Sequence, residues 1–418
     1  MSTAMVASKP LQERLDSARK LTDYVFSLLK PEALYSRPIP ERHRLVFYLG
    51  HLEAFDWNLI ARKTLDLPSF HPTFDKLFEF GIDPPVGQVA ADEPSDWPAI
   101  DEIRSYNKRI RSTLDDLIQQ APEEIMQVAL EHRLMHAETL AYLLHNLPYN
   151  QKVSGSMPVN YSTHLLAAPP MIEIAPGVAT LGQKHGAFGW DNEFAEHQVQ
   201  VPGFSIGKFK VTNGQYLDFV RDGGAPPYFW TQRSGGRQDK KWFYRGMFSE
   251  IPLPLNAPVY VTYAEASAYA QAAGKKLPTE PQFHRAAYAT NGLRETSDHP
   301  ERPYPWGHAE PNARRGNFDF HQWDPLDVDA HPGGDSSFGV SQLVGNGWEW
   351  TATKFGPFPG FEPRPFYPGY SRNFFDDEHY VMKGGSPVTA ARLLRRSFRN
   401  WFRPNYPYVY ASFRLAED

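Results

Sequence analysis

The chain contains no cysteine among its 418 residues. This absence excludes disulfide bonds, thiolate nucleophiles, iron–sulfur clusters and metal sites with cysteine ligands. Long hydrophobic runs are missing as well, because no apolar stretch reaches the roughly 18 residues that a membrane-spanning helix needs. The first residues, MSTAMVASKPLQERL, lack the apolar core of a secretory signal. We therefore expect a soluble, cytoplasmic protein.

The sequence also lacks a strong charge of either sign. Lys and Arg total 43 against 48 Asp and Glu, which gives a net charge of −5, and there is no basic run. This balance argues against nucleic acid or an anionic membrane as the main partner. Nothing in the sequence requires an oligomer, and we expect a monomer.

The two halves of the chain differ in pattern. Residues 1–150 show apolar positions three or four apart, which is typical of one-sided helices. The predicted helices are 11–29, 44–65, 96–120 and 123–147. Because long connections join them, we expect an antiparallel four-helix bundle.

Residues 151–170 are rich in Pro, Ser and Asn and are predicted to be a linker. From 171 to 418 the periodic stretches are short, and only 264–273 and 280–289 are predicted as helices. The predicted fold class is thus a helical domain followed by a loop-rich α+β domain with short strands.

A possible metal site is the strongest chemical signal. His132 and His136 are four residues apart on the helix 123–147, so they share one face of it. That face is apolar, and imidazoles buried there are costly unless a partner satisfies their nitrogens, as a metal ion does. His51, in the predicted helix 44–65, is the best candidate for a third ligand, because side chains of facing helices converge inside a bundle.

Other interpretations of these histidines remain open. They could be partly exposed or water-bonded side chains without a metal. A zinc protease is disfavoured, because the HExxH motif needs Glu where Arg133 stands. Three neutral imidazoles suit Fe(II), Zn, Cu or Ni, and ligand type alone does not choose among them.

At this point the motifs match a known family. His51 with His132-Arg-Leu-Met-His136-Ala-Glu138 resembles the DinB-like iron domain of the ergothioneine-type sulfoxide synthases. The second half resembles the formylglycine-generating-enzyme fold, a C-type-lectin-like domain. Its motifs, in chain order, are Val211-Thr-Asn-Gly-Gln-Tyr216, Gly274-Lys-Lys-Leu-Pro-Thr-Glu280, Gly345-Asn-Gly-Trp-Glu-Trp350, Lys383-Gly-Gly-Ser386 and Phe413-Arg414. True formylglycine-generating enzymes hold copper with cysteines, so that chemistry is excluded here.

The resemblance implies an activity and a site. Family members use Fe(II) and O₂ to join sulfur, or in one branch selenium, to C2 of the imidazole of hercynine (Nα,Nα,Nα-trimethylhistidine). It implies that Tyr367 is the proton donor, and that Tyr370, Asn400 and Trp401 bind hercynine. Aromatic faces suit a quaternary ammonium group. It also implies that the active site lies between the two domains.

The sequence departs from the mycobacterial type of enzyme where the second substrate binds. Phe402 stands in place of an Asp, and Met135 in place of a Gln. The stretch 77–103 has no Lys or Arg and contains Glu79, Asp83, Asp92, Glu93, Asp96, Asp101 and Glu102. A substrate with two carboxylates prefers arginines, whereas carboxylates can accept hydrogen bonds from sugar hydroxyls. This favours the selenoneine synthase branch, whose co-substrate is a selenosugar.

Three alternatives remain open. The first is formation of a C–S bond with cysteine or γ-glutamylcysteine, with Arg396, Arg399 or Arg403 binding the carboxylates. The second is a DinB-like metal-dependent thiol transferase, which needs no O₂. The third is a binding module that recognises sugars or peptides and carries a structural metal.

Overall fold

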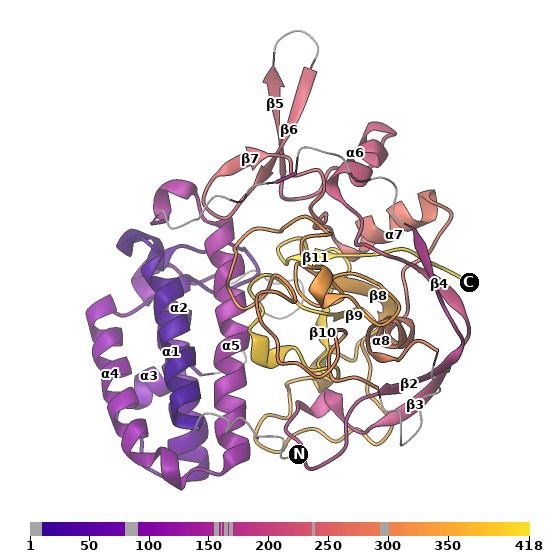
Figure 1. Ribbon diagram of the computed structural model, residues 1–418. Helices are drawn as coiled ribbons and strands as arrows, with labels where there is room; N and C mark the ends of the chain where they lie inside the picture. The colour runs from indigo at the N-terminus through magenta and orange to yellow at the C-terminus, as the bar shows by residue number, and fades with distance from the viewer. Residues whose placement is uncertain are drawn as a thin grey trace. The chain divides into compact units, whose positions relative to one another are not determined.

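The computed structural model describes residues 11–79, 91–153, 159, 161–162, 166, 170–235, 239–292 and 301–418. The chain forms two compact units, Met1–Gly155 and Ser156–Asp418 (Figure 1). The division falls inside the segment that the sequence predicts as a linker. Asp83, one of the acidic residues noted above, lies outside the described residues.

The first unit is helical in the part that the structure describes. Its α-helices are α1 (Leu11–Ser27), α2 (Leu45–Asp56), α3 (Pro72–Leu77), α4 (Ile100–Leu117) and α5 (Glu123–Asn146). Short 3₁₀ turns are η1 (Pro31–Tyr35), η3 (Pro94–Asp96), η4 (Ile118–Gln120) and η5 (Tyr149–Gln151). Helix α1 packs on α5, and α2 packs on both α4 and α5. Nearly all residues of α2 and most residues of α5 are buried, so the two helices lie against each other in the core.

Helix α2 does not end at Asp56 but widens into the π-helix η2 (Trp57–Thr64). There the Leu65 amide donates to the carbonyl of Ile60, five residues back, at 3.1 Å. The Thr64 hydroxyl donates to the Leu59 carbonyl at 2.8 Å. Such wide turns hold one extra residue per turn and are often found near functional sites.

The predicted start of the third helix, at residue 96, is wrong. Helix α4 begins at Ile100, and its N-cap is Ala99 in an extended conformation. Pro98 disfavours the helical conformation for Trp97, so a helix cannot run through this point. The Glu102 carboxylate accepts a hydrogen bond from the Ala99 amide at 3.2 Å, which closes the first turn.

The second unit mixes strands and short helices, as the sequence predicts. Its strands are β1 (Met171–Ile174), β2 (Gly177–Leu181), β3 (His197–Val201), β4 (Phe204–Gly207), β5 (Trp230–Gly235), β6 (Asp239–Arg245), β7 (Glu250–Pro252), β8 (Trp348–Lys354), β9 (Tyr380–Lys383), β10 (Asn400–Phe402), β11 (Ala411–Ser412) and β12 (Ala416–Glu417). The sheets have the orders β1-β4-β12, β10-β9-β8-β11, β2-β3 and β5-β6-β7. Only the β8–β11 pair is parallel among the strand pairs described.

The helices of this unit are α6 (Asn213–Arg221), α7 (Tyr263–Ala272) and α8 (Glu280–Tyr288). Helix α6 is absent from the helices predicted above. Thr212 and Gln215 form a reciprocal capping box before it, since each side chain accepts the other residue's amide, at 3.3 and 2.9 Å. Capping boxes also precede α7 and α8. The Thr-x-x-Gln pattern is therefore the signal that could have found α6.

Several motifs of the second half build this scaffold. Lys210 and Arg414 both bind the carboxylate of Glu349 on β8, with Nζ–Oε1 and Nη2–Oε1 distances of 2.8 Å. All three side chains are fully buried. Burial lowers the pKa of Lys210 to about 8.

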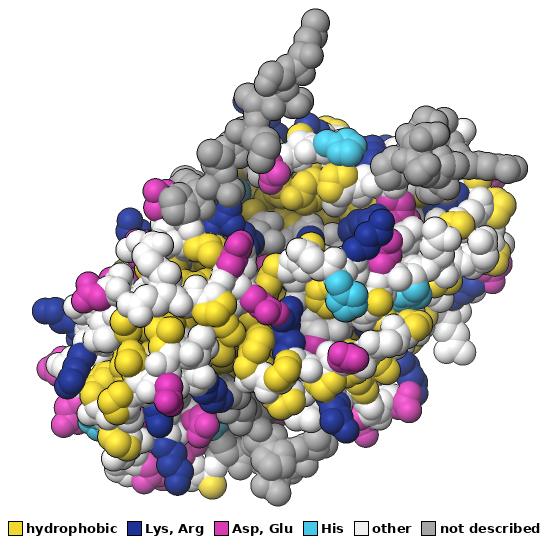
Figure 2. Space-filling view, turned by 90° about the horizontal axis from the view of Figure 1, so that it is seen from below, with side chains coloured by type: hydrophobic (Ala, Val, Ile, Leu, Met, Phe, Trp, Pro, Cys, Tyr) yellow, Lys and Arg dark blue, Asp and Glu magenta, His cyan; other side chains and the backbone are white. Residues whose placement is uncertain are grey.

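On the face drawn in Figure 2, acidic and basic side chains are interspersed over the described residues.

None of the described helices combines the length and the apolar character needed to span a bilayer.

Candidate metal centre

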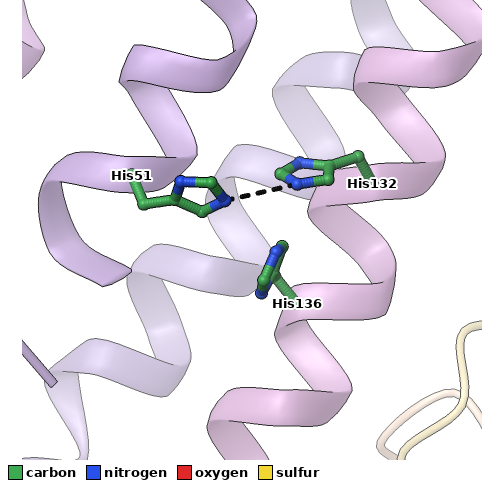
Figure 3. A group of neighbouring side chains, drawn as sticks. All are labelled: His51, His132 and His136. Atoms are coloured by element: carbon green, nitrogen blue, oxygen red, sulfur yellow. Dashed lines mark hydrogen bonds between the residues drawn. The ribbon is translucent and has the colours of Figure 1, made fainter. Parts of the chain in front are cut away.

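Three histidines of the first unit point toward one another (Figure 3). Helix α2 carries His51, and α5 carries His132 and His136 one turn apart. One ring nitrogen from each residue lies within 4.8 Å of the other two. The Nε2 atoms of His51 and His132 are 3.3 Å apart. The structure thus brings together the residues that the sequence selects as ligands.

The surroundings of this triad are apolar and aromatic. The ring of His132 stacks on Phe55 with 3.4 Å between centroids, and Phe47 lies 4.9 Å from the ring of His51. Burial lowers the pKa of His51 to about 4 and holds the pKa values of His132 and His136 well below their usual range. All three imidazoles are therefore neutral near pH 7, which is the form that binds metal ions.

The donor set fits a transition-metal ion. The Nδ1 atom of His51 lies 3.1 Å from the carbonyl of Phe78, so an N–H there leaves Nε2 free to bind. Buried Nδ1 atoms of His132 and His136 have no hydrogen-bond partner within the described ranges. Two nitrogens bound about 2.1 Å from one ion at about 90–110° stand about 3.0–3.4 Å apart, a range that includes the observed separation.

A buried ion-pair network lies beside the triad and was not foreseen. Arg133, which follows His132, donates to Glu53 at 2.8 Å and to Asp56 at 2.7 Å, both on α2. Burial alone would raise the pKa of Glu53, but Arg133 and Arg111 hold that pKa at about 2. Burial raises the pKa of Asp56, although Arg133 opposes this. The sequence offers no local signal for these pairs, because their members are about eighty residues apart.

The described acidic residues of the stretch 77–103 are used mainly within the local structure. Asp92 binds Arg44 at 3.0 Å and accepts a hydrogen bond from the indole of Trp97 at 2.8 Å. Asp96 and Glu102 cap turns, while Glu79, Glu93 and Asp101 are exposed. These positions therefore add no support to the idea of an acidic pocket for sugar hydroxyls.

In the second unit, the predicted hercynine-binding aromatics lie together. The rings of Tyr367 and Tyr370 are 5.6 Å apart, and Tyr370 meets Trp401 at 5.5 Å with an interplanar angle of 84°. Trp190 stacks on Tyr370 at 4.0 Å, and Phe355 stacks on Trp401 at 4.1 Å. We call these five residues the aromatic cluster. The planes of Tyr370 and Trp401 are nearly perpendicular, and aromatic rings are the side chains that suit a quaternary ammonium group.

Side chains outside the aromatic cluster contact its members or their neighbours in the chain. Ser371, next to Tyr370, donates to the carboxylate of Asp191 and accepts from the amide of Asn192 at 2.9 Å. The guanidinium of Arg399 lies 5.0 Å from the ring of Phe355. Trp190, Phe355 and these supports were missed, since nothing in their spacing connects them to Trp401.

The remaining predicted residues lie at separate places. Asn400 and Phe402 alternate with Trp401 on β10; Asn400 accepts the Trp401 amide at 2.9 Å, and Phe402 stacks on Tyr406 at 5.0 Å. Met135 is on α5, directly before His136, and is half-buried.

Two of the three arginines proposed as carboxylate ligands are already engaged. Arg396 binds Glu301 at 2.5 Å, and Arg399 binds Glu280 at 3.0 Å. Arg403 is 37% exposed and makes a longer contact of 3.4 Å with Glu378. Of these three, Arg403 is the one best able to meet a substrate carboxylate.

Comparisons with known proteins identify the family of the chain. The model of the sulfatase-modifying factor enzyme 1-like domain matches residues 159–418. The chain is 30% identical to the hercynine oxygenase of Mycolicibacterium smegmatis over 99% of this chain and 100% of that protein. It is 34% identical to the hercynine oxygenase of Mycobacterium tuberculosis over 75% of this chain and 77% of that protein.

A fungal relative is longer. Ergothioneine biosynthesis protein 1 of Schizosaccharomyces pombe is 28% identical over 96% of this chain but only 55% of its own length. The chain thus spans about half the length of the fungal relatives it matches. From the full-length bacterial match and the matched domain together, the chain belongs to the hercynine oxygenase family of proteins with a sulfatase-modifying factor enzyme 1-like domain.

Proposed function

We propose that this protein is an iron(II)- and O₂-dependent enzyme that forms a carbon–sulfur bond at C2 of the imidazole of hercynine. The observation that carries the proposal is the triad of neutral histidines on α2 and α5, of which His51 and His132 are buried and His136 is half-buried. It occurs in a chain related over its whole length to a hercynine oxygenase. The overall reaction balances if O₂ places one oxygen on sulfur and leaves the other as water, together with the hydrogens lost from carbon and sulfur.

The histidines have a defined task in this proposal. His51, His132 and His136 would hold the iron, and Phe78 would keep His51 in the tautomer that binds through Nε2. A bound Fe(II) ion supplies the one-electron chemistry with O₂ that side chains cannot perform. Apolar rings such as Phe47 and Phe55 exclude water from the ligands.

The aromatic cluster would bind the other end of the substrate. Tyr370 and Trp401 present perpendicular faces to the trimethylammonium group, and Tyr367 brings a hydroxyl that can supply a proton. That the two units contribute to one active site remains a prediction.

The test is an activity assay in which the components of the reaction are supplied or left out in turn. Protein loaded with Fe(II) under anaerobic conditions is given hercynine and either cysteine or γ-glutamylcysteine, with and without O₂, and the product mass is measured. We expect a sulfoxide conjugate only when iron, hercynine and O₂ are all present. A conjugate formed without O₂ would instead favour a thiol transferase, and no conjugate with either thiol would refute the proposal.

A second candidate is the formation of a carbon–selenium bond with a selenosugar. It is favoured by Phe402, which packs on Tyr406 and offers no charge to an amino group, and by the apolar Met135 beside His136. The acids of the stretch 77–103 do not add to it. A competition assay with equal amounts of selenosugar and the two thiols decides between the candidates, because the products differ in mass and in isotope pattern.

A further inference from the structure

We propose that Arg133 is a positioning residue that, with Glu53 and Asp56, fixes α2 against α5 so that the histidine triad is in place before a metal ion binds. We call these three residues the clamp. The inference rests on the proposed metal centre and goes beyond it, because none of the clamp residues is itself a proposed ligand.

The hydrogen bonds of Arg133 all reach helix α2, apart from a long contact to Thr22 at 3.4 Å. Its Nη1 donates to Oε1 of Glu53 at 3.0 Å, and its Nη2 donates to Oε2 of Glu53 at 2.8 Å. Nη2 also donates to Oδ2 of Asp56 at 2.7 Å and to the carbonyl of Leu52 at 3.1 Å. A planar guanidinium that binds a carboxylate through two parallel bonds fixes direction as well as distance.

The clamp and the triad occupy the same stretch of the same two helices. Arg133 directly follows His132 on α5, and Glu53 lies two residues after His51 on α2. A slide of α2 by one residue moves its side chains by about 1.5 Å along the axis. Such a slide would break the bonds of Arg133 and also change the 3.3 Å separation of the two Nε2 atoms.

Burial makes the clamp intolerant of such a slide. The side chains of Arg133 and Asp56 are 0% exposed, and that of Glu53 is 2% exposed. Water therefore cannot replace a lost partner, and an unpaired charge would remain in the core. Apolar contacts between helices carry no such penalty, since they have no strict direction.

The outer partners extend the clamp to the other long helices. Glu53 also accepts from Arg111 on α4, at 2.9 Å from Nε and 2.6 Å from Nη2. Arg111 in turn binds Asp23 on α1 through two bonds of 2.7 Å. One network thus joins α1, α2, α4 and α5, and His51 is set relative to all of them.

The competing explanation is that these charges only contribute to folding. Buried ion pairs replaced together by apolar residues of similar volume often leave a protein as stable as before, or more stable. A purely structural role therefore predicts that such a replacement keeps the metal affinity. A positioning role predicts that the fold survives while the affinity falls.

The experiment uses the full chain, freed of metal and titrated with Co(II), whose visible absorption reports the number and kind of ligands. The triple variant Glu53→Leu/Asp56→Leu/Arg133→Met should stay folded and bind Co(II) about 10- to 100-fold more weakly, with altered absorption, as for changes outside the ligand set. The matched control is Arg19→Met/Asp115→Leu, which removes an α1–α4 pair of 2.6 Å outside the clamp. It should bind Co(II) like the wild type.

A triple variant with Co(II) affinity within twofold of the wild type would overturn the proposal. If the triple variant does not fold, Arg133→Lys takes its place, since it keeps the charge and loses the two-pronged geometry. We expect it to bind Co(II) about tenfold more weakly, and wild-type binding by this variant refutes the clamp. If the wild type itself binds no Co(II), the metal centre fails first, so the two failures can be told apart.

Discussion

The histidine triad and the aromatic cluster are built by different means. The triad stands on two regular helices, where residues four apart share a face and buried charges lock the register. The aromatic cluster takes Tyr367 and Tyr370 from turns and Trp401 from a strand of three residues. Helix geometry makes ligand positions calculable from spacing, whereas the cluster depends on packing between distant segments. Metal binding should therefore withstand changes in the second unit, and the cluster should withstand changes in the first.

Removal of a ligand should have the largest effect. We expect His132→Ala to lose bound iron and to lower turnover by about a thousandfold or more, because two imidazoles hold the ion poorly. The measurements are the iron content of the purified protein and the rate of product formation. His321→Ala is the control, since that histidine is exposed and lies in the second unit. If His132→Ala keeps its full iron content, the triad does not hold the iron, and this half of the comparison is wrong.

A change at Trp401 of the aromatic cluster should affect substrate binding alone. A cation–π contact of about 2 kcal/mol corresponds to about a 30-fold change in affinity. We expect Trp401→Leu to raise the KM for hercynine by about that factor and Trp401→Phe to raise it less, while iron content stays unchanged. Trp306→Leu, a half-buried tryptophan that packs on Tyr304, is the control. An unchanged KM in Trp401→Leu would remove the cluster from the substrate site.

A smaller effect is expected at Phe402, where the choice of second substrate is tested. Phe402→Asp adds a carboxylate on a half-buried strand, and an ion pair there is worth about 1 kcal/mol. We expect a roughly fivefold shift in kcat/KM toward thiols that carry an amino group, relative to a selenosugar. Phe402→Asn introduces a side chain of the same size as Asp but without the charge. It should shift the preference for the second substrate little. Equal shifts in both variants would show that volume, and not charge, decides.

The smallest effect concerns pH and comes from two buried lysines of the second unit. Burial lowers the pKa values of Lys210 and Lys383 to about 8. The folded lysines release protons that the unfolded chain holds up to about pH 10.5. Stability should therefore fall as the pH drops from about 10 to about 8.

Urea unfolding at several pH values, followed by near-ultraviolet circular dichroism, measures how the free energy of unfolding depends on pH. Lys383→Met should reduce this dependence of stability on pH. A wild-type protein whose unfolding midpoint does not change between pH 8 and 10 contradicts the assignment.

The two units also differ in how much of their structure the sequence predicts. Helices α1, α2, α4 and α5 were predictable, as was the shared face of His132 and His136, because such patterns are local. The short helix α3 was not among the predicted helices. The start of α4 was predicted wrongly although Pro98 indicates where the helix begins. Helix α6 was not predicted although the capping residues Thr212 and Gln215 indicate it. Arg133 with Glu53, and Phe355 with Trp401, could not be paired from the sequence, since folding alone brings such distant positions together. The roles of the cluster residues came from family resemblance and not from spacing.

The π-helix η2 has a consequence for how this family can vary in length. It holds extra backbone directly after the stretch of α2 that carries His51. Loss of one residue between Trp57 and Thr64 would let the segment wind as an ordinary α-helix, and only the residues after the segment would rotate. We therefore expect an alignment of relatives to place its gaps in this segment, downstream of the ligand, and not before His51.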